Sequence, residues 1–335
     1  MLKAMANLTI LFSLLCVMQG SGQDIHFSQF YTVPMEVNPA LTGMMNGNYR
    51  LSAIYRSQWK SVTAPYSTSG FGAEWSMGGG KRSLRDVVGL GFSAGNDVAG
   101  DAKLSTSTFL FSAAYNKAIG ALSTKYLGFG LQMGMNSSFL NMNSLRFDEQ
   151  YNGAPATETI NFNDSRYFDV SAGAEYTQNF FQFSSFKIGA AVYHITNPTY
   201  SFLNNSSVKV FRKYAFNGGL DYRLNRSLEL YPRAWLAFQG PSSELIFGSL
   251  ARFQWRALAR HTEMGFYAGA FYRWKDALIL CTRMDLNHLS ITFSYDVNVS
   301  KLTRVSNGGG APEISLTYIG KVRLMHRKNI FCPRF

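Results

Sequence analysis

The chain has 335 residues and a formal net charge of +12 at pH 7; aromatic residues make up 15% of it and charged residues only 16%. This length suits one large barrel or two ordinary domains. The basic residues are spread out apart from residues 321–335, and no nucleic-acid-binding motif accompanies them, so a nucleic-acid partner is not expected. The three cysteines, Cys16, Cys281 and Cys332, cannot form a disulfide framework. No Cys or His spacing predicts zinc or another cofactor.

Residues 1–22 have the features of a secretory signal peptide. Lys3 supplies the positively charged start, and the apolar run at 8–18 is too short to span a membrane. The small residues at 20–22 predict cleavage after residue 22. A lipoprotein signal through Cys16 is the alternative, but the bulky leucine before this cysteine argues against it.

Residues 23–48 do not have the pattern of a strand. They contain aromatic residues and two prolines, Pro34 and Pro39, without sustained alternation of apolar and polar side chains. We therefore expect this stretch to form a plug-like segment, tucked into or under the strand domain that follows.

From Tyr49 onward the chain alternates between apolar and polar residues, as a strand with two different faces does. The clearest case is Leu289–Ser300, in which every odd position is apolar and every even position is polar. The pattern predicts fourteen strands, at 49–56, 71–77, 88–94, 103–116, 127–135, 168–176, 186–192, 214–223, 228–238, 244–255, 263–274, 278–285, 289–300 and 313–318.

Strand length and loop length indicate a membrane barrel. A tilted strand needs about 9–11 residues to cross a bilayer, and an even number of strands is the rule for single-chain bacterial barrels. The long gaps at 138–166, 196–210 and 300–311 all follow odd-numbered strands, whereas tight turns follow even-numbered ones. Long loops are external in such barrels and short turns are periplasmic.

The sequence therefore predicts an all-β protein, a transmembrane antiparallel β-barrel of about 14 strands of the outer-membrane type. The barrel spans residues 49–320, and a basic tail follows at 321–335. An even strand count predicts that the N- and C-termini are both periplasmic. The alternative is a soluble β-sandwich or propeller, which also has many short strands.

The polar face of these strands carries cations and anions in near balance. Charges confined together tend to pair, because an unpaired buried charge is costly. We expect a lumen crossed by ion pairs rather than a wide channel. The predicted network comprises Arg50, Arg56, Glu74, Asp169, Glu175, Asp221, Arg223, Arg252, Glu263, Arg273, Arg283, Asp285 and Asp296.

An enzyme is not expected. The five histidines lie far apart in the sequence, and neither a Gly-x-Ser-x-Gly elbow nor a His-Glu-x-x-His zinc motif is present. The glycine runs at 78–80 and 308–310 lack the Lys-Ser/Thr of a phosphate-binding loop.

Several short motifs resemble those of the PorP/SprF family, which are outer-membrane barrels of the type IX secretion system of Bacteroidota. They are H-F-S-Q-F-Y at 26–31, N-P-A-L-T-G at 38–43, Y-R-S-Q-W at 55–59, E-I-S-L-T-Y at 313–318 and C-P-R-F at 332–335. The resemblance covers the whole chain after the predicted signal peptide. It implies a barrel that supports secretion or surface attachment of partner proteins, including gliding adhesins in some members.

The resemblance also implies partners: secreted proteins with type IX C-terminal signal domains, other type IX secretion components and outer-membrane lipid. We predict periplasmic partner contacts from the N-terminal segment and the tail, although the tail could instead bind lipid phosphates. The alternative function is a passive porin or hydrophobic-solute channel. The predicted contact residues are His26, Phe27, Phe30, Tyr31, Asn38, Pro39, Lys321, Arg323, Arg327, Lys328, Cys332 and Phe335.

Overall fold

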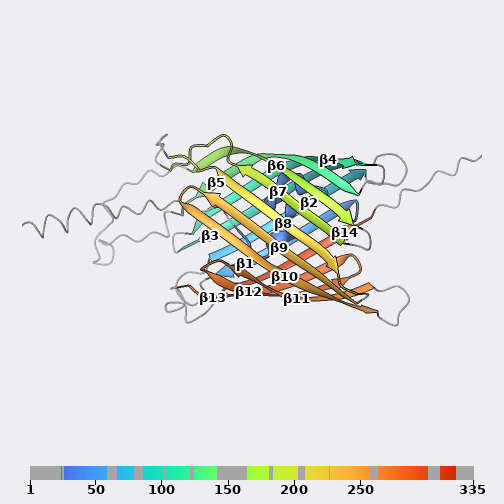
Figure 1. Ribbon diagram of the computed structural model, residues 1–335. Helices are drawn as coiled ribbons and strands as arrows, with labels where there is room; N and C mark the ends of the chain where they lie inside the picture. The colour runs from blue at the N-terminus through green and yellow to red at the C-terminus, as the bar shows by residue number, and fades with distance from the viewer. Residues whose placement is uncertain are drawn as a thin grey trace, which may run out of the picture.

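The computed structural model describes residues 24, 26–58, 66–78, 86–100, 103–120, 124–141, 164–180, 184–202, 208–225, 227–256, 263–300 and 310–321. In these residues fourteen antiparallel strands form a closed barrel, in which each strand pairs with its neighbours in sequence and β14 pairs with β1 (Figure 1). The predicted fourteen-strand barrel is therefore confirmed.

The strands are generally longer than the sequence pattern predicts. They are β1 (Tyr49–Gln58), β2 (Tyr66–Gly78), β3 (Val87–Ala99), β4 (Leu104–Ile119), β5 (Lys125–Phe139), β6 (Ser165–Phe180), β7 (Ser184–Tyr193), β8 (Lys213–Arg223), β9 (Leu228–Gln239), β10 (Ser242–Arg256), β11 (Glu263–Arg273), β12 (Ala277–Leu286), β13 (Leu289–Asn298) and β14 (Pro312–Gly320).

The two faces of the wall differ as the alternation predicts. On β5 the outward-facing Leu131 is 58% exposed, whereas its inward-facing neighbour Gln132 is 1% exposed. Large apolar side chains are strongly exposed on every strand from β1 to β14, although β9, β11 and β13 each have only one, Phe238, Phe266 and Phe293. Such an apolar band is what a bilayer requires of a barrel. No helix among the described residues is long and apolar enough to cross a membrane.

The two ends of the barrel carry different connections. We call the end where β7 finishes and β8 begins the long-loop mouth, because the connections after β5, β7 and β13 lie there. The other end, where β1 begins and β14 finishes, is the short-turn mouth. It carries the two-residue turn Asn287–His288 between β12 and β13. The long-loop mouth also has short connections, at 240–241 and 274–276.

The described residues before β1 lie inside the barrel (Figure 1). This lumen segment consists of Asp24 and residues 26–48, and it contains three short helices: η1 (Phe30–Thr32), α2 (Pro34–Val37) and η2 (Pro39–Leu41). Pro34 and Pro39 each occupy the first helical position, where a missing N–H costs nothing. Asn38 caps η2, since its Oδ1 accepts a hydrogen bond of 3.0 Å from the backbone N–H of Ala40.

The lumen segment runs from one mouth to the other. Asp24 contacts His194 and Gln239 at the long-loop mouth, whereas Asn48 donates a backbone hydrogen bond to Gly320 at the short-turn mouth. The prediction that the N-terminal part and the tail lie on the same side is therefore wrong for Asp24, which is at the opposite mouth from Lys321. An even number of strands places only the start of β1 and the end of β14 at the same mouth. The lumen segment before β1 then runs through the barrel once more, so Asp24 lies at the other mouth.

One side of the lumen is apolar, which the sequence pattern did not predict. Inward positions of β7 to β12 form a buried cluster, against which Phe30, Tyr31 and Leu41 of the lumen segment pack. The signal was present in the sequence as breaks in alternation: Ile246 and Leu250 share the inward parity of Glu244. The wall members are Ala191, Tyr193, Ala215, Trp235, Ala237, Ile246, Leu250, Tyr267, Phe271, Ile279 and Cys281.

Candidate functional site

The lumen segment and the wall around it are the candidate functional site. The segment touches the inner face of every strand, so it is enclosed on all sides. The contacted positions include Arg56 on β1, Glu74 on β2, Gly89 on β3, Asn116 on β4, Gln132 on β5, Ala174 on β6, Tyr193 on β7, Asn217 on β8, Trp235 on β9, Glu244 on β10, Phe271 on β11, Cys281 on β12, Asp296 on β13 and Glu313 on β14.

Glycines on the inward face of β3, β5 and β6 seat the second half of the segment. A Cβ atom at Gly130 would overlap the backbone of Pro39, and one at Gly89 would overlap the carbonyl oxygen of Thr42. Only glycine allows another backbone to approach a strand so closely. We call Gly89, Gly130 and Gly173 the glycine seat; at Gly173 the overlapped atom is Oδ1 of Asn38.

Asn38 joins the segment to β6 and β8. Its Nδ2 donates to the carbonyl oxygen of Ala174 at 3.0 Å and lies 3.1 Å from Oδ1 of Asn217. The same nitrogen is 3.2 Å from Oε2 of Glu175, which also accepts a 2.9 Å hydrogen bond from Asn217. A buried carboxylate requires such donors, and here the lumen segment itself supplies one of them.

A buried group of charges holds the first half of the segment. Glu313 accepts hydrogen bonds from the backbone N–H groups of Ser28 at 3.0 Å and Gln29 at 2.7 Å. Asp296 accepts from the Ser28 hydroxyl at 2.6 Å. The guanidinium groups of Arg56 and Arg273 lie 3.0 Å and 3.1 Å from the same Asp296 oxygen, Oδ2. We call these residues the charge clamp.

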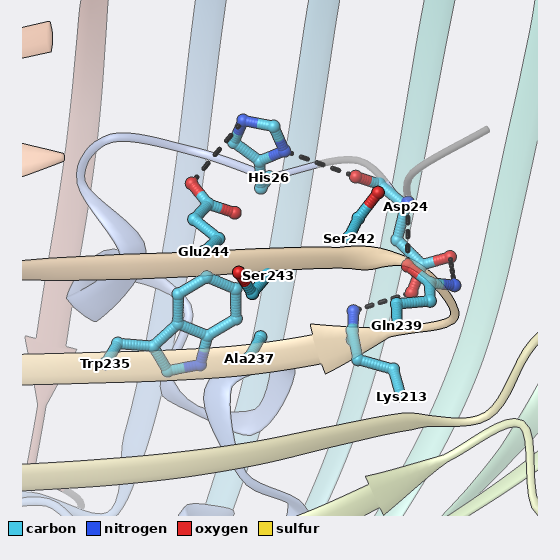
Figure 2. A pocket seen from close by; sticks show the side chains of 9 residues that line it. All are labelled: Asp24, His26, Lys213, Trp235, Ala237, Gln239, Ser242, Ser243 and Glu244. Atoms are coloured by element: carbon cyan, nitrogen blue, oxygen red, sulfur yellow. Dashed lines mark hydrogen bonds and ion pairs between the residues drawn. The ribbon is translucent and has the colours of Figure 1, made fainter. Parts of the chain in front are cut away.

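Asp24 is held at the long-loop mouth by three wall residues. Lys213 donates to its Oδ2 at 2.6 Å, and His194 Nε2 lies 2.9 Å from that oxygen. Gln239 donates to its Oδ1 at 3.1 Å, and Figure 2 shows this carboxylate between Lys213 and Gln239. Burial alone would raise the pKa of Asp24, but Lys213 and His194 outweigh it and hold this pKa well below its ordinary value.

His194 lies between two carboxylates. Its Nδ1 is 2.9 Å from Oδ2 of Asp169, while its Nε2 faces Asp24. Burial lowers the pKa of His194, but the two carboxylates exceed that effect and raise it to about 9. The imidazole is therefore protonated at neutral pH and serves as a cation that bridges the wall and the lumen segment.

Most members of the predicted charge network are found in pairs. Arg50 binds Glu74, and Arg56 and Arg273 share Asp296. Asp169 pairs with the imidazolium of His194, whereas Glu175 differs from simple cation–anion pairing because amide groups hold it. The side chain of Glu263 lies outside the described residues. Other pairs include Arg223–Glu229, Arg252–Glu229, Arg233–Asp221 and Arg283–Asp285.

The predicted partner-contact residues of the N-terminal segment face the chain's own wall. Phe27 packs beside Ile54, and Asn38 and Pro39 are buried against the glycine seat. Phe30 and Tyr31 contact Phe271, and His26 lies 3.7 Å from Glu244. These side chains therefore meet the barrel instead of a periplasmic partner, because they pack against or bond to wall residues inside the lumen.

In the tail, Lys321 is exposed at the short-turn mouth. The other predicted tail residues, Arg323, Arg327, Lys328, Cys332 and Phe335, lie outside the described residues, as do the predicted signal peptide and Cys16. Cys281 is buried and has a free thiol.

Sequence reasoning missed the residues that hold Asp24. His194 and Lys213 flank a connection, and Gln239 ends a strand. Lys213 lies in the family-like motif R-K-Y at 212–214, but that motif does not say what the lysine contacts. The only sequence signal was that Lys213 and Gln239 alternate with outward-facing apolar residues, which places their side chains on the inner face of the wall. Among the described residues, no group of His, Cys, Asp and Glu side chains is arranged to hold a metal ion.

The fold resembles those of solved outer-membrane proteins at low identity. The CymD monoaromatic hydrocarbon channel is 11% identical, with 86% of this chain and 92% of that chain covered and a TM-score of 0.47. A FadL homologue from Pseudomonas aeruginosa is 10% identical, with 84% and 92% covered and a TM-score of 0.48. CdiB from Escherichia coli is 8% identical, with 80% and 63% covered and a TM-score of 0.47. Such distant likeness carries no argument about function.

No curated protein sequence matches the chain. The family model described as type IX secretion system membrane protein PorP/SprF matches residues 19–318, which include the lumen segment and thirteen complete strands together with most of β14. The resemblance seen in the short motifs is thus confirmed over nearly the whole barrel. The chain belongs to the PorP/SprF family of type IX secretion system membrane proteins.

Proposed function

We propose that this outer-membrane barrel supports secretion or surface attachment of partner proteins by binding them, without catalysing a reaction. The observation that carries the proposal is the lumen segment, which contacts all fourteen strands from within. A lumen filled in this way offers its two mouths as binding surfaces. The partners are proteins with type IX C-terminal signal domains and other components of the secretion system.

The long-loop mouth is the proposed outer face. External loops of such barrels are longer than periplasmic turns, and the connections after β5, β7 and β13 are the longest here. In this orientation the tail beginning at Lys321 is periplasmic, whereas Asp24 is at the cell surface. The basic tail is then available to periplasmic components of the secretion system.

The test is deletion of the gene, followed by quantification on intact cells, with an antibody, of a secreted protein that carries a type IX C-terminal signal domain. We expect the protein to be retained in the cell or released to the medium, and we expect restoration by the wild-type gene. Normal display on cells that lack the barrel would contradict the proposal.

The alternative function, a passive porin or hydrophobic-solute channel, makes a different prediction. Purified barrel in planar bilayers should then show a steady conductance or admit an apolar solute. We expect a closed barrel instead, because charges and apolar groups of the segment are matched by the wall throughout the lumen. A steady open state in the wild-type protein would favour the channel.

A further inference from the structure

The residues that hold Asp24 form a preorganised group of donors on the barrel wall. Lys213 begins β8, His194 follows β7, and Gln239 ends β9, so all three are fixed by neighbouring strands. The side chains of His194 and Lys213 are only 6% and 13% exposed. Because a buried cation without a counter-charge is costly, this group requires an anion.

The geometry of the group suits a carboxylate. Lys213 and His194 converge on one oxygen of Asp24, and Gln239 donates to the other. Asp169 faces the opposite nitrogen of His194 and so orients the imidazole with Nε2 toward the bound oxygen. Two oxygens in one plane, each with its own donors, are the pattern of an Asp or Glu side chain or of a peptide C-terminus.

The group is open to a second ligand. The side chain of Asp24 is 25% exposed, and a pocket beside it is lined by Lys213, Gln239, Trp235 and Glu244 (Figure 2). An incoming carboxylate can therefore reach Lys213 and Gln239 from the solvent side as Asp24 moves away from them. Glu244 on the far side of the pocket is already paired with Arg273, at 3.1 Å, so Lys213 and Gln239 are the donors that face an incoming carboxylate.

Displacement of Asp24 does not require the rest of the lumen segment to leave. Ser28 and Gln29, a few residues further on, are held separately by Glu313, and Asn38 is held by β6 and β8. The exchange of one carboxylate for another therefore costs only the local contacts at the mouth.

We propose that Lys213, His194 and Gln239 form a carboxylate-binding site at the long-loop mouth, occupied in cis by Asp24 and able to accept an acidic peptide in its place. The inference rests on the proposed function in one respect only, namely that the carboxylate belongs to a partner protein. Binding of an acidic partner then releases Asp24 from the wall.

The test uses the purified full-length barrel in detergent and a fluorescent peptide, Gly-Gly-Asp-Gly-Gly with a blocked C-terminus, followed by fluorescence anisotropy. Wild-type protein should bind it weakly, because Asp24 competes. Asp24→Asn should bind it at least about tenfold more tightly, since the lysine is left without its counter-charge. A second change, Lys213→Met, should abolish this gain and also the weak binding by the wild-type protein.

Matched controls separate this site from general charge effects. Asp276→Asn removes another acidic group at the same mouth, where it contacts Arg273, and should leave peptide binding unchanged. A peptide with Asn in place of Asp and a free C-terminus tests whether a terminal carboxylate is accepted equally well. With both its Asp and its free C-terminus removed, the peptide should not bind.

Equal binding of the acidic and fully neutral peptides, or a folded Asp24→Asn protein that gains no affinity, would overturn the proposal. Gel mobility with and without heating shows whether each variant is a folded barrel. If Asp24→Asn does not fold, the loss of wild-type binding in Lys213→Met decides the question. Surface display in cells is measured separately, so this site and the proposed function can fail independently.

Discussion

The two halves of the lumen segment are held by different physical means. Residues 38–43 sit in the glycine seat, where the backbone of Pro39 and Thr42 and the side chain of Asn38 lie directly against strand glycines. Asp24 and residues 26–29 are held by the charge clamp and by the donors at the long-loop mouth. Both halves lie in the same lumen, but one is fixed by shape and the other by charge.

The two kinds of contact differ in how they respond to conditions and to ligands. Close packing is insensitive to pH and salt and fails only when volume is added. Charge pairing depends on each partner's ionisation and on what competes for it. The glycine seat is thus suited to keeping the lumen filled, whereas the mouth around Asp24 is suited to exchange with a ligand.

Loss of Asp296 should have the largest effect on the charge-held half. In Asp296→Ala, the almost fully buried Arg56 and Arg273 lose their shared counter-charge. Removing one partner of a buried ion pair typically destabilises a protein by about 3–5 kcal/mol. Unfolding in urea, followed by tryptophan fluorescence, measures the change.

The control for Asp296→Ala is Lys117→Ala, which breaks an exposed pair with Asp86 at 3.4 Å on the outside of the barrel. It should unfold like the wild type. If both variants unfolded at the same urea concentration, the charge clamp would not be a main support of the lumen segment.

Added volume should break the shape-held half. In Gly130→Ala the new methyl group meets the backbone of Pro39, which cannot rotate away as a side chain could. Overpacking of this kind costs about 1–3 kcal/mol, and we expect residues 38–43 to lose protection from hydrogen exchange. Exchange followed by mass spectrometry locates the loss.

Gly95→Ala is the matched control for the glycine seat. Gly95 is also an inward position, on β3, but a Cβ atom there would have its nearest neighbour at 3.8 Å, an ordinary contact. Unchanged protection in Gly95→Ala and a loss in Gly130→Ala would show that close packing against Gly130 holds residues 38–43 in place. Equal behaviour of the two variants would remove the distinction between the halves.

Alkaline pH should produce the smallest effect, confined to the mouth. The pKa of His194 is raised by folding from 6.5 to about 9, so its stabilisation is complete below pH 6.5 and is lost as the pH rises through about 9. Loss of the imidazolium leaves Asp24 and Asp169 with Lys213 as the remaining cation among these groups.

Hydrogen exchange corrected for the intrinsic rate at each pH measures this effect. Protection of the Asp24 amide, which donates to Gln239, should fall between pH 7 and pH 10, whereas Ser28, Gln29 and residues 38–43 should stay protected. A uniform fall along the segment would mean that the two halves open together, against the comparison drawn above.

The sequence predicted the barrel well because each strand of the wall repeats the same local alternation of apolar and polar residues. Each residue of Leu289–Ser300 faces lipid or lumen according to its parity alone, and the same rule gave all fourteen strands. Loop lengths added the difference between the two mouths. The inward position of Asp296 followed from parity, as did those of Arg56 and Arg273.

The lumen segment was beyond such reasoning. Parity does not say which strands Asn38 bridges, or that Asp24 meets Lys213 across 189 residues of chain. The inward glycines were visible in the sequence, but a glycine facing an empty lumen and one facing another backbone have the same pattern.

By itself, therefore, the sequence determined the strand count, the two faces of the wall and the family, because these depend on periodicity and on motifs within short stretches. Only the tertiary structure decided that the segment crosses the lumen, that Asp24 lies at the opposite mouth from Lys321, and which donors surround its carboxylate. Those features depend on contacts between distant parts of the chain, which form only when the barrel closes around the segment.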